Sequence, residues 1–224
     1  NLRETIIKNN SIDSMQRAGI GLYSYYCNME WIEANEIIGA NYGFYWFYGN
    51  TVGSTTDSSV VINNISKSNA VYGFYARDLE RVRMYHNVFE APSTRYAFYW
   101  YNLRRNNIEF ANNILIGGGF YGFYAYFGGA SYQPRLFDYN DYYLNNYTYF
   151  CYFNGSLTAS LAALKTANTN HNQNCVSVDP GFLSSNDGRT YAPGLNNIGI
   201  NLGISTDVDG NTRPNSGDGT KVDI

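Results

Sequence analysis

The residues that can do acid–base chemistry gather in the middle of the chain. Arg81, Arg83, Tyr85 and His86 lie within one stretch of six positions. Elimination at a uronic acid needs a cation to neutralise the sugar carboxylate and a base to remove the adjacent C–H proton, and Arg, His and Tyr can fill these roles. We therefore take these four residues as the candidate catalytic set of a lyase.

The same arginines also have a simpler interpretation as structural ion pairs. Asp78 and Glu80 lie close to them in the sequence, and Glu109 falls at the position of Arg83 in the repeat described below. Charged pairs on neighbouring strands would use the arginine side chains in this way. The complete basic cluster comprises Arg77, Arg81, Arg83, Arg95, Arg104 and Arg105.

Aromatic residues form a second set of candidates because one four-residue sequence recurs. Tyr42-Gly43-Phe44-Tyr45 has near copies at 72–75, 96–99 and 121–124, and a looser one at 20–23. If the central residue of each copy points into a core, the next residue points outward, because side chains alternate along a strand. The outward residues are then Tyr23, Tyr45, Tyr75, Tyr99 and Tyr124, followed two positions later by Tyr25, Phe47, Arg77, Tyr101 and Tyr126.

These outward rings predict a ligand-binding strip. Rungs about 4.8 Å apart would place them in two columns, beside a smooth lane formed by the small residue that precedes each centre, which is glycine in four copies and Ala97 in the fifth. Rings with hydroxyl groups suit the apolar faces and hydroxyls of sugars, and an exposed apolar patch of this kind usually has a partner. The alternative is that the protein's own tail covers the strip.

The elements that position these residues follow from the spacing of the repeat. The centres are separated by 22, 30, 24 and 25 residues, which is the period of a stacked array. A second pattern runs in step, in which an apolar residue is followed three positions later by Asn. Its asparagines are Asn10, Asn35, Asn64, Asn87, Asn113 and Asn140.

Each unit therefore reads as a short strand, an Asn-bearing turn, a second strand and a variable loop. The Leu-x-x-Leu-x-Leu framework of a leucine-rich repeat is absent, whereas the period and the inward aromatic residues match a parallel β-helix. The crossover rule makes the coil right-handed. We expect an all-β, right-handed parallel β-helix of about six rungs over residues 1–153, with the asparagines stacked in a ladder.

Residues 154–224 are predicted to form a short helix and an irregular tail packed on the same domain. Leu157, Leu161 and Leu164 have helical spacing within residues 156–167, and Ser156 is a candidate N-cap. The remainder is rich in Gly, Asn, Asp and Pro. Cys151 and Cys175 are candidates for a disulfide that ties the last rung to the tail, and the alternative is three buried thiols, with Cys27 as the third.

Composition excludes several classes of function. The net charge is −3 and the pI about 5.3, which argues against nucleic-acid binding. No apolar run is long enough to span a membrane.

Asp207, Asp209 and Asn211 could hold Ca²⁺, but a tight turn explains them as well, and we expect no other cofactor or metal. Because an apolar pair of the repeat lies close to residue 1, the chain reads as part of a longer protein with upstream rungs or further domains.

Several motifs resemble those of the pectate-lyase-like superfamily of right-handed parallel β-helix proteins. The rungs resemble its aromatic-Gly-Ile-Tyr strands with Asn-bearing turns. Residues 178–182 are similar to the Asp-Pro-x-Phe of secreted bacterial members, residues 196–203 to their Ser-Pro-Ala-Ile-Asp-x-Gly, and residues 207–214 to their Asp-x-Asp-Gly-Asn-x-Arg-Pro. The resemblance implies a secreted or cell-surface bacterial protein.

Members of this superfamily include polysaccharide lyases, glycoside hydrolases and adhesins, so the resemblance leaves the activity open. The paired-aspartate motifs of its hydrolases and the Arg-x-Pro-x-x-Arg of pectate lyases are absent from the rungs. We therefore favour a recognition module that presents the tyrosine strip to a polysaccharide or a cell-surface protein. A uronate lyase is the alternative.

Overall fold

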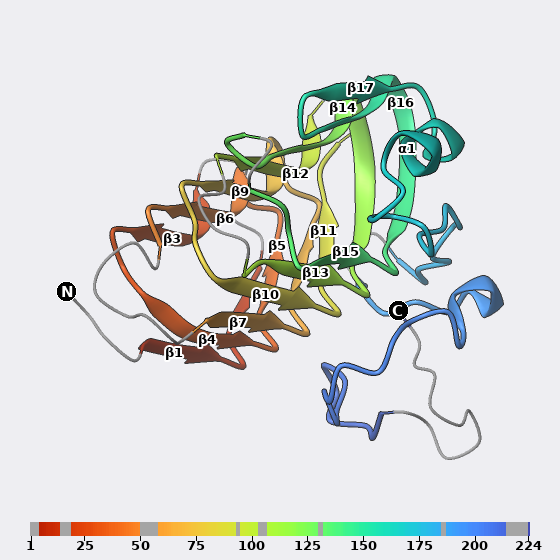
Figure 1. Cartoon of the computed structure of the whole chain (residues 1–224). Helices are drawn as coiled ribbons and strands as arrows, with labels where there is room; N and C mark the ends of the chain where they lie inside the picture. The colour runs from red at the N-terminus through yellow and green to blue at the C-terminus, as the bar shows by residue number, and fades with distance from the viewer. Residues whose placement is uncertain are drawn as a thin grey trace.

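The chain forms a right-handed parallel β-helix with a C-terminal tail packed along its side (Figure 1). The computed structural model describes residues 5–13, 19–49, 58–92, 95–102, 107–129, 132–184, 187–213 and 224. Arg104 and Arg105 of the basic cluster lie outside these residues. Each coil contributes one strand to each of three faces, and each strand pairs in parallel with its counterpart in the next coil.

The three faces are defined by their strands. Face 1 is a six-stranded sheet of β1 (Thr5–Lys8), β4 (Met29–Glu33), β7 (Ser59–Ile62), β10 (Val82–Tyr85), β13 (Glu109–Ala111) and β15 (Leu136–Asp138). Face 2 contains β2 (Ser11–Ile12), β5 (Glu36–Ile38), β8 (Ile65–Lys67) and β11 (Val88–Glu90). Face 3 contains β3 (Ile20–Tyr25), β6 (Tyr42–Phe47), β9 (Tyr72–Arg77) and β12 (Tyr96–Tyr101). The long strands β14 (Ile114–Tyr126) and β16 (Asp141–Phe153) run through faces 2 and 3.

Each coil thus has three strands, where the sequence predicted two. The missed strands are those of face 2, which contain only two or three residues before β14. They show no alternation of apolar and polar residues, because the tail covers their outer side and both sides are buried.

The predicted asparagine ladder is confirmed along the corner between faces 1 and 2. Each amide nitrogen donates to the side-chain oxygen of the next Asn at 2.8–3.1 Å. The same oxygen also accepts the backbone N–H of the preceding Asn, as Asn113 Oδ1 accepts from Asn87 at 3.0 Å. The residue before each Asn adopts a left-handed conformation, with φ between 51° and 57° at Asn9, Ala34, Asn63, His86, Asn112 and Tyr139.

The ladder continues beyond Asn140 into the tail. The backbone N–H of Asn140 donates to Sγ of Cys175 at 3.4 Å, so the thiol occupies the next ladder position. Val176 then forms a parallel bridge with Asp141 and donates its N–H to the Asn140 carbonyl at 2.9 Å. The expectation that the repeat stops after residue 153 is therefore wrong, because residues 172–178 add part of a seventh coil.

Of the two alternatives left open by the sequence, the candidate Cys151–Cys175 disulfide is not formed in this structure, and all three cysteines are free thiols. Cys175 takes part in the ladder as described above. Cys151 lies in β16 with its sulfur 3.1 Å from Oγ1 of Thr158. Burial raises the pKa of both thiols to about 12, so they behave as small buried apolar groups.

The core inside the coil is built from the centres of the recurring sequence. Phe44, Phe74, Phe98 and Phe123 are at most 1% exposed and point into the coil, as predicted, and the ring centroids of Phe44, Phe74 and Phe98 follow one another at 5.9 and 5.4 Å. The glycine lane, however, points inward and not outward. A Cβ at Gly43 would lie 1.7 Å from Oγ of Ser66 and 2.6 Å from the Gly73 carbonyl, so only glycine fits at this corner.

The C-terminal end of the coil is covered by a short strand and a helix. Ser156–Thr158 form β17, antiparallel to β16, and α1 spans Leu161–Ala167. The N-cap is Ser160, whose hydroxyl accepts from the Ala163 N–H at 3.1 Å, so the expected cap at Ser156 is four residues too early. Among the described residues no helix is long and apolar enough to cross a membrane.

The tail runs back along the outside of faces 1 and 2. Ile38, Ile65, Val88 and Ile114 of face 2 pack against tail residues that include Leu195 and Val208. On face 1, Ile62, Tyr85 and Ala111 pack against Ile200, Leu202 and Ile204. A single-turn helix, η1 (Pro193–Leu195), lies within this segment. The tail and the coil therefore share apolar clusters, as expected for one domain.

Replacing a central ladder asparagine should destabilise the coil strongly. Asn87→Ala removes the side-chain acceptor of the buried Asn64 backbone N–H and one acceptor of the Asn64 amide, and it also removes the amide that donates to the Val61 and Tyr85 carbonyls. We expect the free energy of unfolding to fall by about 3–5 kcal/mol. Asn145→Ala, an exposed asparagine of β16, is the matched control and should change it by less than about 0.5 kcal/mol. Equal effects in a denaturant titration would refute the ladder's role.

The burial of the Asp141 carboxyl should make stability depend on pH. Burial raises the pKa of Asp141 to about 7, above the value of about 4 for an unfolded aspartate. The folded state therefore favours the protonated acid, and stability is full below about pH 4 and falls as the pH rises through about 7. Asp141→Asn should be more stable than the wild type at about pH 9 by roughly 2–4 kcal/mol.

Thermal unfolding at about pH 4 and about pH 9 measures this difference, since the two proteins should agree at the lower pH. Glu30→Gln, which alters an exposed carboxylate on β4, is the control. A constant offset between Asp141→Asn and wild type at both pH values would contradict the assignment.

Candidate functional site

The outer surface of face 3 carries a continuous column of stacked tyrosines. Neighbouring ring centroids are 4.6–5.6 Å apart, with interplanar angles of 4–18°. The predicted members all take part, and β16 adds one more, because Tyr152 pairs with Tyr124. This central column consists of Tyr23, Tyr45, Tyr75, Tyr99, Tyr124 and Tyr152.

A second column lies beside it that simple alternation does not predict. Counting back two residues from Phe44 places Tyr42 inside the coil, but Gly43 occupies the inward position and Tyr42 turns outward. Its ring packs edge-on against Tyr45 at 5.0 Å. The column consists of Tyr42, Tyr72, Tyr96, Tyr121 and Tyr149, with centroids 5.4–6.0 Å apart.

The third column contains aromatic residues and one charged residue, Arg77. Its members occupy one position of the parallel register, as predicted, and are Tyr25, Phe47, Arg77, Tyr101 and Tyr126. The Arg77 guanidinium lies 5.5 Å from the Tyr101 ring centroid and 3.1 Å from the buried carboxylate of Asp78. We call the three columns together the tyrosine face.

The stacking of the rings determines which of their atoms face the solvent. Because the rings of the central column lie face to face, their flat sides contact one another, and their edges and hydroxyls point outward. Tyr23 and Tyr25, at the first coil, are 57% and 49% exposed, whereas Tyr45, Tyr75 and Tyr99 are partly covered by their neighbours. The result is a regular surface of C–H edges and hydroxyl groups with little charge.

Several hydroxyls of this face have a raised pKa and remain protonated at ordinary pH. Burial, with a smaller contribution from neighbouring tyrosines, raises the pKa of Tyr72, Tyr99 and Tyr124 above its usual value of about 10. These groups can therefore donate and accept hydrogen bonds. They are not suited to serve as bases.

The described part of the tail lies away from the tyrosine face. In Figure 1 the blue tail lies on the opposite side of the coil from β3, β6 and β9, and its apolar contacts are with faces 1 and 2. The sequence left open whether the tail covers the tyrosines or leaves them accessible to a ligand. The described residues of the tail pack on faces 1 and 2 and not on the tyrosine face.

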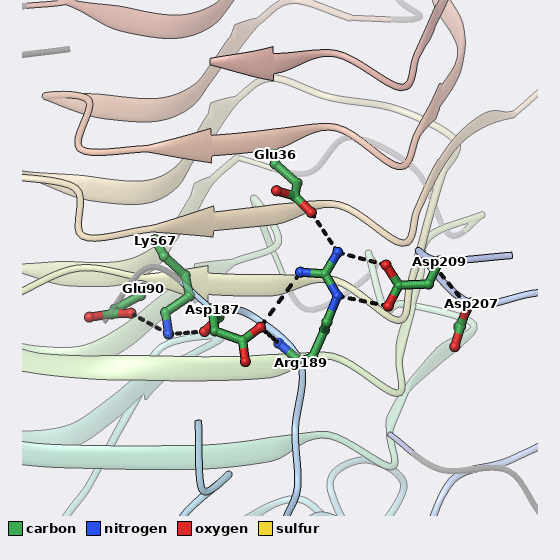
Figure 2. Close-up of polar contacts among 7 residues, drawn as sticks. All are labelled: Glu36, Lys67, Glu90, Asp187, Arg189, Asp207 and Asp209. Atoms are coloured by element: carbon green, nitrogen blue, oxygen red, sulfur yellow. Dashed lines mark hydrogen bonds and ion pairs between the residues drawn. The ribbon is translucent and has the colours of Figure 1, made fainter. Parts of the chain in front are cut away.

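A polar clamp holds the tail on face 2 (Figure 2). Arg189 of the tail donates to both carboxylate oxygens of Asp209, at 2.7 and 2.6 Å, and to Glu36 of β5 at 2.9 Å. Lys67 of β8 is buried, forms an ion pair with Glu90 of β11 at 3.5 Å and donates to the Asp187 carbonyl. Sequence reasoning missed this clamp, because the contacts that join the tail to the coil, Arg189 to Glu36 and Lys67 to Asp187, span more than 100 residues.

The candidate catalytic residues do not converge on one site. Arg81 and His86 lie at opposite ends of β10, and both are buried. Arg83 is exposed on face 1 and pairs in register with Glu109, as predicted, while Glu109 forms its ion pair with Arg135 at 3.2 Å. Tyr85 is buried and donates to Glu109. Burial, followed by that hydrogen bond, raises its pKa, which argues against Tyr85 as a base.

The candidate calcium residues form a tight turn. Asp207 accepts hydrogen bonds from the backbone N–H groups of Asp209 and Asn211, at 2.9 and 2.8 Å, and from the Asn211 amide at 2.9 Å. The Asp209 carboxylate is bound by Arg189. Each carboxylate therefore has a protein partner that serves the turn or the clamp.

Alkaline titration should separate the stacked tyrosines from the others. We expect Tyr72, Tyr99 and Tyr124, whose pKa is raised by burial, to ionise only above the usual tyrosine value of about 10, together with loss of the fold. Near-ultraviolet absorbance of tyrosinate, followed alongside circular dichroism, measures both events. A single transition of all tyrosines near pH 10 with the fold intact would contradict the stacked arrangement.

Comparison with known proteins supports the fold. A family model described as the right-handed β-helix region matches residues 1–136, which is more than half of the chain and ends where β15 begins. Searches of curated proteins and of solved structures find no match. The match assigns no reaction, since a fold of this kind carries many functions. With its three-faced coil and its asparagine ladder, the chain belongs to the right-handed β-helix family.

Proposed function

We propose that the chain is a recognition module that binds a polysaccharide through the tyrosine face. The observation that supports this most strongly is the set of three aromatic columns in one register, on the side of the coil away from the described tail. Tyrosine provides a rigid apolar body with a polar tip, which suits a partner that is itself both apolar and hydroxylated. The motifs of the tail favour a secreted or cell-surface bacterial setting.

The chemistry of the face favours a neutral glycan over a charged polymer. Hydroxyls that stay protonated can exchange hydrogen bonds with sugar hydroxyls, and ring edges can contact their C–H groups. Arg77 is already paired with Asp78, so the columns offer little to attract a polyanion. Because the motif repeats along the coil, a polymer can contact several rungs at once and gain affinity by avidity.

A uronate lyase is the weaker candidate. Its residues would have to act from face 1, where Arg83 is exposed but Tyr85 is bound to Glu109. His86 lies under the tail. A cell-surface protein is the alternative class of partner, and the experiment below distinguishes it by competition with soluble glycan.

Binding to a panel of neutral and uronate-containing polysaccharides tests the proposal. The double variant Tyr75→Ala/Tyr99→Ala should bind the preferred neutral glycan at least about tenfold more weakly, as expected for the loss of about 1.4 kcal/mol. Tyr75→Phe/Tyr99→Phe keeps the stacked rings and reports the hydroxyls alone. Tyr191→Ala, at a tail tyrosine that is 55% exposed, is the matched control and should bind like the wild type.

Three outcomes would overturn the proposal. They are binding of no glycan, equal affinity of the double alanine variant and wild type once both are shown to be folded, and capture of a cell-surface protein that soluble glycan does not displace. Release of unsaturated product from a uronate polymer, abolished by Arg83→Ala, would favour the lyase instead.

A further inference from the structure

The tail leaves the coil beside a buried carboxyl group. Just after the last ladder position, Val176 forms a parallel bridge with Asp141 at the start of β16. Two residues later, the Val178 N–H donates to Oδ1 of Asp141 at 2.9 Å. The backbone and the side chain of Asp141 therefore both hold the first residues of the tail.

The surroundings of this carboxyl group are apolar. Asp141 occupies the position of Ile65, Val88 and Ile114 in the parallel register of face 2. Those three residues form an apolar cluster with the tail, in which Val176 takes part. Asp141 itself is 0% exposed. A carboxyl group thus ends an apolar column and lies beneath the segment that it holds.

The hydrogen bonds of Asp141 are incomplete for an ionised group. Oδ1 accepts the Val178 N–H, whereas Oδ2 is buried and has no hydrogen-bond partner among the described residues. A carboxylate with a full charge and a single donor is costly to bury, and the neutral acid is much less so. Burial accordingly raises the pKa of Asp141 to about 7.

The charged group that faces Asp141 from the tail is a second carboxylate. Asp179 accepts the Tyr143 hydroxyl of β16 at 3.1 Å and the Gly181 N–H at 2.9 Å, which fix its position. Its negative charge adds to the rise in the pKa of Asp141. From the neighbouring strand, β14 places Ile114 beside Asp141. If Asp141 ionises, it therefore repels the segment that covers it.

We propose that Asp141 is a pH-sensitive latch, which holds residues 176–179 on the coil while its carboxyl group is protonated and releases them when it ionises. The latch is fully closed below the pKa of a free aspartate, about 4, and weakens as the pH rises through about 7. Opening is local, because the clamp around Arg189 keeps its charges: Arg189 lowers the pKa of Asp209. The latch is independent of the glycan proposed to bind the tyrosine face.

Amide hydrogen exchange in the wild type and in Asp141→Asn tests the proposal, because a comparison of two proteins at one pH cancels the intrinsic pH dependence of exchange. For the Val176 and Val178 amides, the ratio of the wild-type rate to the variant rate should rise at least about tenfold between about pH 5 and about pH 8. The Ile114 amide of β14, which donates to the Asn87 carbonyl at 2.8 Å, is the reference and should keep a constant ratio.

A titration of the wild type keeps the test valid if Asp141→Asn does not fold. The carboxyl ¹³C signal of Asp141 should titrate with a midpoint near 7, and the Val176 and Val178 amide signals should change with the same midpoint. Asp179→Asn removes the facing charge and should lower this midpoint. A constant ratio of exchange rates, an equal rise at Ile114, or a midpoint of Asp141 near the free value of about 4 would overturn the latch.

Discussion

The asparagine ladder is the interaction on which the rest of the structure depends. Each buried amide has its donors and acceptor satisfied only when the coils stack in one register, so a slip of one residue would leave several polar groups unpaired inside the protein. The same register brings each Phe centre onto the next inside the coil and each tyrosine onto the next outside. The tyrosine columns are thus a consequence of a hydrogen-bond constraint on the opposite side of the coil.

The ladder also determines where the tail attaches. The residue before each ladder Asn has a left-handed backbone, which turns its side chain outward at the corner. Asn63 and Asn112 use these side chains to bind the Thr206 and Ile200 carbonyls of the tail, and His86 lies between them. Because the tail is anchored at this corner and on faces 1 and 2, the described residues leave the tyrosines of face 3 accessible to a partner.

Much of this arrangement follows from residue spacing. The ladder asparagines, the inward phenylalanines and the central tyrosine column were all predictable, because each recurs at one position of the coil. The second tyrosine column was not, since Gly43 breaks the alternation that places Tyr42. The strands of face 2 were missed because the tail buries their outer side, and the partial seventh coil was hidden because Cys175 stands where the pattern has Asn. The clamp depends on contacts between distant segments of the chain, which a local sequence pattern does not contain.

Hydrogen–deuterium exchange with and without a bound polysaccharide tests the central claim most directly, because it locates the binding surface on the intact protein. Binding at the tyrosine face predicts added protection in β6, β9 and β12 and unchanged exchange in the tail over residues 187–213. Protection confined to the tail and faces 1 and 2, with face 3 unchanged, would contradict the account.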